Sequence, residues 1–313
     1  MTNTFRTEIP NSTGGIRIDY TSRVFLAGSC FATHIADKLQ YGKLQTEVNP
    51  FGILYNPQAL ATTFSEVDQV DNWPVEFHNE RYHCLFAHST LSASTEAELR
   101  DNLINASNVL RQSLSAATHF ILTPGTAWVY RDLQSNRIAG NCHKLPQHRF
   151  RKELLSPSEC TRAIQELIAV IRQHNPKAEI VFTISPIRHL RDGFVENQRS
   201  KAHLIAAVHQ VVQEQNTSYF PAYEIMMDDL RDYRFYSEDM IHPNEVAINY
   251  IWEKFRATWL DADASALYDE VAALRRAEAH RPFNPDSEQH RKFLQSLHAK
   301  RESLQQRGVN WHP

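Results

Sequence analysis

Two short strings, far apart in the chain, contain residue types that could perform acyl-transfer chemistry. The first, Gly28-Ser29-Cys30, follows an apolar run at residues 24–27 and precedes residues 31–39, where apolar side chains recur with helical spacing. This pattern predicts a strand, a tight turn and a helix. A cysteine on the turn into a helix meets backbone N–H groups and the positive end of the helix dipole, which both favour the thiolate. We therefore expect Cys30 to be an activated nucleophile, with inert packing as the alternative, whereas Ser29 would need a strong base nearby.

The second string, Asp239-Met240-Ile241-His242-Pro243, contains such a base. A carboxylate three residues before a histidine can bond one ring nitrogen and leave the other free to accept a proton. Residues 243–259 have the apolar spacing of a helix with proline in its first turn, so His242 is predicted just before a helix. We interpret His242 as the base and Asp239 as the residue that orients it. The alternative is structural, with either residue stabilising the start of that helix.

Two further polar residues follow a later predicted strand. Arg188 and His189 come shortly after the apolar run at residues 180–184. Ligands bind at the carboxyl ends of the strands in open α/β sheets, so both side chains are predicted to contact substrate. An ion pair of Arg188 with Asp192 or Asp232 is the competing interpretation.

The elements that must position these residues alternate along the chain. Apolar runs at residues 120–122 and 180–184 each follow a helix-like stretch. Alternating helices and buried strands predict a mainly parallel sheet with helices on both faces, a three-layer α/β/α fold. We predict one such domain at residues 1–260. The remainder, residues 261–313, is rich in Ala, Glu, Arg, Gln and His, and is predicted to form an accessory helical extension.

The composition argues against several classes of function. The chain has 313 residues, with 33 Lys and Arg against 36 Asp and Glu, so no overall charge draws it to nucleic acid or anionic lipid. No signal peptide and no run of roughly 18 apolar residues is found, so we expect a cytoplasmic protein without a membrane partner. Its 4 cysteines form no CxxC pair and its 16 histidines no HExxH pattern. Free thiols, no metal and no cofactor are therefore expected.

The string Gly28-Ser29-Cys30-Phe31-Ala32 is also the signature of the GSCFA family, which the chain resembles over residues 22–258. Further matching segments are Asn49-Pro50-Phe51-Gly52-Ile53-Leu54-Tyr55-Asn56-Pro57, Pro124-Gly125-Thr126-Ala127-Trp128, Gly140-Asn141-Cys142-His143-Lys144, Ser185-Pro186-Ile187-Arg188-His189 and Asp232-Tyr233-Arg234-Phe235-Tyr236. The resemblance implies an SGNH-hydrolase-like (flavodoxin-like) α/β/α fold and kinship with SGNH (GDSL-like) esterases and acyltransferases.

That kinship implies roles for particular residues. The Gly-Asp-Ser turn of SGNH enzymes aligns with Gly28-Ser29-Cys30, which puts Cys30 at the position of the nucleophile. If the alignment is shifted by one residue, Ser29 occupies that position instead. Gly52 resembles the glycine whose N–H faces the developing oxyanion. A turn glycine that needs positive φ is the competing role for Gly52.

SGNH enzymes also have a Gly-x-Asn segment after the third strand, and this segment differs in the present chain. The segment Gly125-Thr126-Ala127 has alanine where the superfamily has asparagine, so Thr126 or Asn141 is expected to supply the missing oxyanion donor, unless the hole has only two donors. Asn141 and His143 lie in a predicted loop, where binding residues concentrate, and a solvated loop is the alternative for both.

Together these features predict a hydrolase or acyltransferase that acts on a small-molecule ester, thioester or acylated sugar. Cys30 or Ser29 attacks the acyl carbon, His242 removes the proton, and water or another acceptor releases the acyl group. The alternative is a non-catalytic ligand-binding module on an SGNH-like scaffold. A third interpretation is an assembly factor whose charged C-terminal extension recruits a partner.

Overall fold

A five-stranded parallel sheet forms the centre of the molecule. The computed structural model describes residues 7–11, 15–281 and 283–311. The strands of the sheet are β1 (Arg23–Gly28), β2 (Gln45–Val48), β5 (His119–Thr123), β9 (Glu179–Phe182) and β10 (Ser218–Tyr219). Their spatial order is β10-β9-β5-β1-β2, and all four pairings are parallel. Numbered along the chain this order is 2-1-3-4-5, which is the flavodoxin-like arrangement. The predicted α/β fold with a mainly parallel sheet is confirmed.

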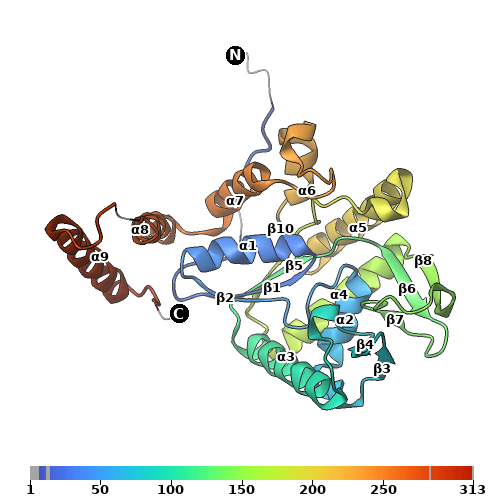
Figure 1. Cartoon of the computed structure of the whole chain (residues 1–313). Coiled ribbons are helices and arrows are strands. Elements are labelled where there is room, and N and C mark those ends of the chain that lie inside the picture. Colours follow the sequence, from blue (N-terminus) through green and yellow to red (C-terminus); the bar gives the residue numbers. More distant parts are fainter. Residues whose placement is uncertain (1–6, 12–14, 282, 312–313) are drawn as a thin grey trace.

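Helices cover both faces of this sheet, which gives three layers (Figure 1). Alternate strand residues point to opposite faces, so Phe25 and Phe120 belong to one core and Leu26 and Ile121 to the other. The first core is covered by α2 (Pro57–Ser65), α3 (Glu96–Ala116), α4 (Pro157–His174) and α5 (Phe194–Glu214). The second core is covered by α1 (Cys30–Tyr41) and α7 (Glu245–Trp259).

Most of the long helices begin at a side-chain cap. The capping residues, whose side chains accept a hydrogen bond from a backbone N–H of the first turn, are Ser29 for α1, Asn56 for α2, Thr95 for α3, Ser156 for α4 and Asn244 for α7. Such caps satisfy donors that a helix N-terminus leaves without an intrahelical partner. They fix where each helix starts, and therefore where the strand-to-helix turns lie.

Two small antiparallel sheets lie beside the main sheet and were not predicted. One pairs β3 (Val75–His78) with β4 (Arg81–Cys84). The other has the order β7-β6-β8 and contains β6 (Trp128–Asp132), β7 (Ile138–Ala139) and β8 (Phe150–Leu154). The short helix α6 (Ala222–Glu224) precedes the loop that leads to α7.

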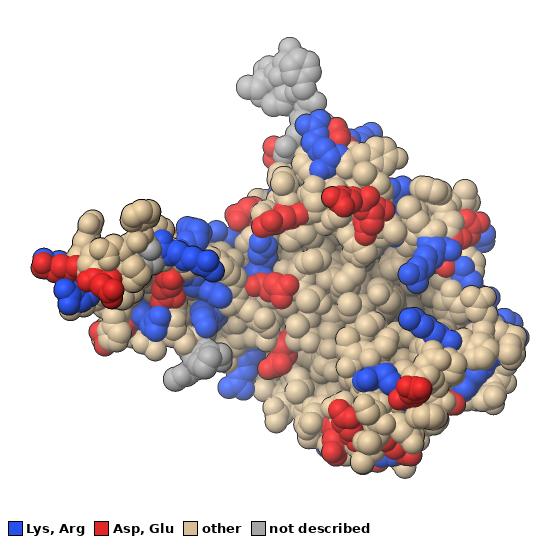
Figure 2. Space-filling model, in the orientation of Figure 1, with Lys and Arg blue, Asp and Glu red and all other residues tan. Residues whose placement is uncertain are grey.

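The C-terminal part is helical, with α8 (Ala262–Glu278) and α9 (Glu288–Gln306). Helix α8 packs on the α/β body, because the Tyr268 hydroxyl donates to the Lys38 carbonyl at 3.1 Å and its ring lies 5.3 Å from that of Trp252. Helix α9 contacts α8 through a small separate core and projects away from the sheet (Figure 1). Figure 2 shows Lys, Arg, Asp and Glu mixed over this projection. The predicted boundary between an α/β domain at residues 1–260 and a helical extension at residues 261–313 stays a prediction.

The four cysteines are free thiols, as predicted. Within the described ranges, no helix is both long and apolar enough to cross a membrane. The same residues contain no cluster of three or more His, Cys, Asp or Glu side chains suited to a metal ion.

Candidate active site

The candidate site lies where β1 and β5 end, at the carboxyl edge of the sheet. These strands are neighbours, yet β1 leads into α1 on one face and β5 leads toward α4 on the other. Ligands bind at such a switch point because the connections diverge there. The Ser29 N–H donates to the Thr123 carbonyl at 2.9 Å, which joins the two strand exits.

Gly28 makes this close approach of the strands possible. Its φ of 134° is in the region that favours glycine, and a Cβ on it would lie 2.2 Å from the Thr123 carbonyl oxygen. Any side chain at this position would therefore force β1 and β5 apart.

The two candidate nucleophiles occupy different environments. Ser29 is fully buried, and its Oγ caps α1 by accepting from the Phe31 N–H at 3.3 Å. Cys30 is the first residue of α1 and is partly exposed. The structure therefore gives Ser29 a capping role, whereas Cys30 is partly buried and packs against the core that α1 covers.

The Cys30 thiol is not a ready-made thiolate, contrary to the sequence-based expectation. Burial raises its pKa above the usual value, although the N–H groups of Cys30 and Phe31 and the charge of Lys201 act in the opposite direction. Desolvation therefore outweighs the helix N-terminus. A nucleophilic role for this thiol would therefore require a base to take its proton.

Lys201 lies behind the site and was missed in the sequence. It is 1% exposed, and its Nζ donates to the carbonyls of Gly125 and Ser185, both at 2.7 Å. Burial lowers the pKa of this lysine to about 7, and the charge of Cys30 opposes that shift. The available signal was its position on the buried stripe of α5, between Asn197 and Leu204 at helical spacing.

His189 turns one ring nitrogen toward the strand exits. Its Nε2 is buried without a hydrogen-bond partner. A Cβ built on Gly125 would lie 2.8 Å from this nitrogen and 3.4 Å from the Ser29 Cβ, so the three groups are close together. The Tyr55 ring packs edge-on at 5.4 Å. Burial, with the charges of Lys201 and His242, lowers the pKa of His189 to about 3. Its imidazole is therefore neutral at pH 7.

His242 and Asp239 form the expected pair. The His242 Nδ1 lies 2.6 Å from Asp239 Oδ2, and Asp239 Oδ1 accepts from the His242 N–H at 3.0 Å. These hydrogen bonds, led by that from the backbone N–H, lower the pKa of Asp239 to about 2. The ionised carboxylate fixes the tautomer that carries its proton on Nδ1 and leaves Nε2 as the acceptor. Helix α7 is capped by Asn244 instead, so the capping alternative does not account for either residue.

The His242 ring lies close to α1. Burial lowers the pKa of His34, which lies one turn after Cys30, and the His242 ring lowers it further. The same ring acts on His189, on the other side of the strand exit. The Asp239–His242 loop therefore lies near α1 and near His189.

Arg188 holds the loop that carries the base. Its backbone N–H donates to the Ile241 carbonyl at 3.2 Å, and its Nη1 donates to the Met240 carbonyl at 2.9 Å. These two carbonyls belong to the residues directly before His242. Arg188 thus links the exit of β9 to the position of His242.

The proposed ion pairs of Arg188 are not formed. Asp192 lies 2.6 Å from Lys152, and Asp232 lies 2.8 Å from Arg234. The competing interpretation of Arg188 as a partner of either aspartate is therefore wrong.

Gly52 and Thr126 have structural partners. The Gly52 N–H donates to the Asn49 carbonyl at 2.7 Å, with φ at 73°, which corresponds to the turn-glycine alternative. The Thr126 hydroxyl lies 3.0 Å from the Ser200 hydroxyl and accepts from the Trp128 N–H at 3.0 Å. The Gly52 N–H is thus used within its turn, and the Thr126 hydroxyl is held between Ser200 and Trp128.

Asn141 and His143 are fixed to β4 rather than solvated. The Asn141 Oδ1 accepts from the His143 N–H at 2.8 Å, and the His143 Nε2 lies 2.7 Å from the Cys84 carbonyl. The His143 ring stacks on His83 at 4.7 Å, and burial lowers the pKa of His143 to about 4. The solvated-loop alternative is wrong for His143, which is 5% exposed.

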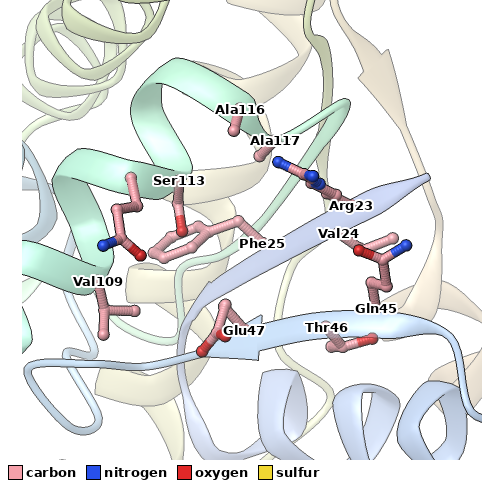
Figure 3. Close-up of a pocket in the computed structure, with 11 residues that line it drawn as sticks. Arg23, Val24, Phe25, Gln45, Thr46, Glu47, Val109, Ser113, Ala116 and Ala117 are labelled. Atoms are coloured by element: carbon pink, nitrogen blue, oxygen red, sulfur yellow. The ribbon is translucent and has the colours of Figure 1, made fainter. Parts of the chain in front are cut away.

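A hollow of about 230 Å³ lies away from these residues, where β1 and β2 begin. Figure 3 shows Arg23, Gln45 and Glu47 around it, with Ala117 at the end of α3. Its lining contains no cysteine or histidine, so it offers no pair of nucleophile and base.

Comparison with known proteins shows the family. A sequence model of the GSCFA family matches residues 23–255. The chain belongs to the GSCFA family. A model described as "GSCFA domain protein, C-terminal domain" matches residues 271–313 of this GSCFA protein. The resemblance inferred from Gly28–Ala32 is confirmed.

Solved structures with similar folds have low sequence identity. A putative GDSL-like lipase from Parabacteroides merdae is 11% identical, with a TM-score of 0.41, over 82% of this chain and 100% of that chain. A family 3 carbohydrate esterase from Clostridium thermocellum is 12% identical, with a TM-score of 0.34, over 75% of this chain and 94% of that chain. No curated protein matches the sequence.

Proposed function

We propose that this GSCFA protein is an SGNH-like hydrolase or acyltransferase that acts on an ester or thioester through Cys30. The carrying observation is the Asp239–His242 pair, at 2.6 Å, in a loop close to the helix that begins at Cys30. A carboxylate, an imidazole and a thiol are the three groups that nucleophilic acyl transfer uses.

In the proposed reaction His242 moves the proton at each step. Cys30 Sγ forms a bond to the acyl carbon while its proton passes to His242 Nε2. The leaving alkoxide or thiolate departs with that proton, which produces a thioester on Cys30. Water or an acceptor hydroxyl then attacks the thioester and gives its proton to His242, which passes it to Cys30 Sγ as the bond between sulfur and the acyl carbon breaks. The raised pKa of the thiol favours this general-base route over a thiolate formed before substrate binds.

The Cys30 N–H and the His189 Nε2–H are the proposed oxyanion donors. The Cys30 N–H is at the first position of α1, where no intrahelical acceptor exists. The His189 Nε2 has no partner, and a neutral imidazole can carry a proton there when its other nitrogen is the acceptor. His189 thus takes the place proposed for Thr126 or Asn141. Donors aimed at developing charge account for much of the barrier lowering in acyl transfer.

The test is a panel of 4-nitrophenyl esters and acyl-CoA thioesters. We expect wild-type turnover of at least one member, and a loss of about 10³-fold or more in kcat for Cys30→Ala and His242→Ala. Ser29→Ala should remain active while losing about 1 kcal/mol of stability with its helix cap. The control His298→Ala removes another histidine with a carboxylate partner, at 3.6 Å on α9, and should have wild-type kcat.

Three outcomes would contradict the proposal. No turnover of any substrate would favour a non-catalytic binding module. Full activity of Cys30→Ala with loss in Ser29→Ala would identify the serine as the nucleophile. Unchanged turnover in His242→Ala would remove the proposed base.

A further inference from the structure

Exposed aromatic rings gather around one guanidinium beside the candidate base. The Phe194 and Tyr233 side chains are 66% and 68% exposed. The Arg188 guanidinium carbon lies 5.5 Å from the Phe194 ring, 6.0 Å from the Tyr233 ring and 5.2 Å from the Tyr236 ring. These rings come from the start of α5 and from the segment before the Asp239–His242 loop. Exposed apolar side chains that gather in one patch mark binding sites more often than those scattered singly.

The guanidinium of Arg188 has N–H groups that make no hydrogen bond in the described structure. Its Nη1 donates to the Met240 carbonyl at 2.9 Å, which is the one side-chain hydrogen bond of Arg188 in the described structure. The two carboxylates that the sequence suggested as its partners, Asp192 and Asp232, pair with Lys152 and Arg234. The N–H groups of Nε and Nη2 are left for an incoming acceptor. A planar guanidinium fork matches the two oxygens of a carboxylate or a phosphate.

Ring contacts alone do not explain this arrangement. Arg188 is itself partly exposed, and Phe194 and Tyr233 keep two-thirds of their surfaces in solvent, so the rings do not enclose the guanidinium. The apolar rings also lower the local polarity, which strengthens the attraction between the guanidinium and an anion.

The position of this cluster ties it to the reaction. The backbone and side chain of Arg188 bond the carbonyls of Ile241 and Met240, immediately before His242. The next residue, His189, faces the strand exits of Ser29 and Gly125. A group bound at Arg188 would therefore lie beside the base and the proposed oxyanion donors.

We propose that Arg188, with Phe194, Tyr233 and Tyr236, forms a subsite for an anionic group of the substrate, a carboxylate or a phosphate attached to a planar or apolar portion. The guanidinium pairs with the anion and the rings contact the apolar portion. The reaction in which this ligand takes part rests on the proposed function, but its binding does not.

The test measures binding without catalysis. Isothermal titration calorimetry compares phenyl phosphate, benzoate and neutral benzyl alcohol on the full-length protein. We expect phenyl phosphate or benzoate to bind at least about tenfold more tightly than benzyl alcohol, because an anion on a guanidinium contributes more than about 1.4 kcal/mol. The stronger of the two anions identifies the preferred group.

Substitutions of Arg188 test whether the anion binds at this residue. Arg188→Gln should weaken the anion by about tenfold or more, and Arg188→Lys should lose part of the affinity because the ammonium lacks the planar fork. The matched control is Arg234→Gln, since Arg234 also lies near a ring, Phe235 at 5.8 Å, but is paired with Asp232. That control should stay within about twofold of wild type. Equal binding of the anions to wild type and Arg188→Gln, or no preference over benzyl alcohol, would overturn the proposal.

A kinetic experiment distinguishes a failure of the proposed anion subsite from a failure of the proposed hydrolase activity. The ratio of KM for 4-nitrophenyl butyrate to KM for 4-nitrophenyl hydrogen succinate should fall about tenfold or more in Arg188→Gln. Anion binding without cleavage of either ester would support the subsite and contradict the hydrolase. Cleavage with the same ratio in both proteins would support the hydrolase and overturn the subsite.

Discussion

At the scale of residues, burial rather than helix position decides the state of the nucleophile. Cys30 starts α1, where backbone N–H groups face its sulfur, yet its pKa is raised because the surroundings are apolar. A thiol in this state is a weak nucleophile at rest, so the proposed mechanism depends on the Asp239–His242 pair as its base. This dependence distinguishes the site from one that relies on a preformed thiolate.

The charge of Lys201 should be visible in the reactivity of Cys30. Because the pKa of Lys201 is itself about 7, its positive charge is present only near and below neutral pH, where it favours the Cys30 thiolate. Lys201→Gln should therefore slow iodoacetamide alkylation of Cys30 about three- to tenfold near pH 6 and leave the rate unchanged above about pH 8. The glutamine keeps an N–H donor for the Gly125 or Ser185 carbonyl. Lys292→Gln, in an exposed pair with Glu288, is the control. An unchanged profile would separate Lys201 from the thiol.

His189 should affect the transition state more than substrate binding. His189→Phe removes the Nε2 donor but keeps a ring against Tyr55. We expect kcat to fall about 10²- to 10³-fold with little change in KM, as for the loss of one oxyanion donor. Steady-state kinetics on the best ester of the panel provide the measurement, with His174→Phe, on the exposed end of α4, as control. A rise in KM at constant kcat would make His189 a ground-state contact instead.

At the scale of elements, the turn from β1 into α1 positions the chemistry. Gly28 lets β1 end against β5, and Ser29 caps the helix that Cys30 begins. The sequence predicted this strand, turn and helix, because the strand is a continuous apolar run and the helix has regular apolar spacing. The small sheets β3–β4 and β6–β8 were missed, since their strands are short and mix exposed with buried residues.

Replacing Gly28 should destabilise the protein more than replacing another glycine with positive φ. Gly28→Ala adds the backbone strain and also a 2.2 Å contact with the Thr123 carbonyl, whereas Gly308, with φ at 92°, has nothing within 4 Å of the added Cβ. We expect losses of about 3 kcal/mol or more for Gly28→Ala and about 1 kcal/mol for Gly308→Ala. Urea unfolding followed by far-ultraviolet circular dichroism measures both. Equal losses would mean that β1 can move away from β5 without cost.

At the scale of the whole molecule, the flavodoxin-like strand order places the β1–α1 turn and the segments after β5 and β9 at one edge of the sheet. The sequence was sufficient to predict the parallel sheet and the partners Asp239 and His242, which are close in the chain. It did not reveal Lys201 or the free nitrogen of His189. Both depend on how α5 and the loop after β9 pack behind Gly125, and such contacts between distant segments leave only a weak pattern in the sequence. The donors of Gly52 and Thr126 were likewise assigned without knowledge of the turns that engage them.

The most direct measurement is the location and rate of acyl transfer to the enzyme. Protein mixed with 4-nitrophenyl butyrate is quenched in acid and analysed by peptide mass spectrometry, with and without neutral hydroxylamine, which cleaves a thioester but spares a serine ester. We expect one hydroxylamine-sensitive butyryl group on Cys30 in wild type, formed about 10²-fold or more slowly in His242→Ala. A hydroxylamine-resistant group on Ser29, or equal acylation rates with and without the imidazole, would contradict the thiol–imidazole mechanism.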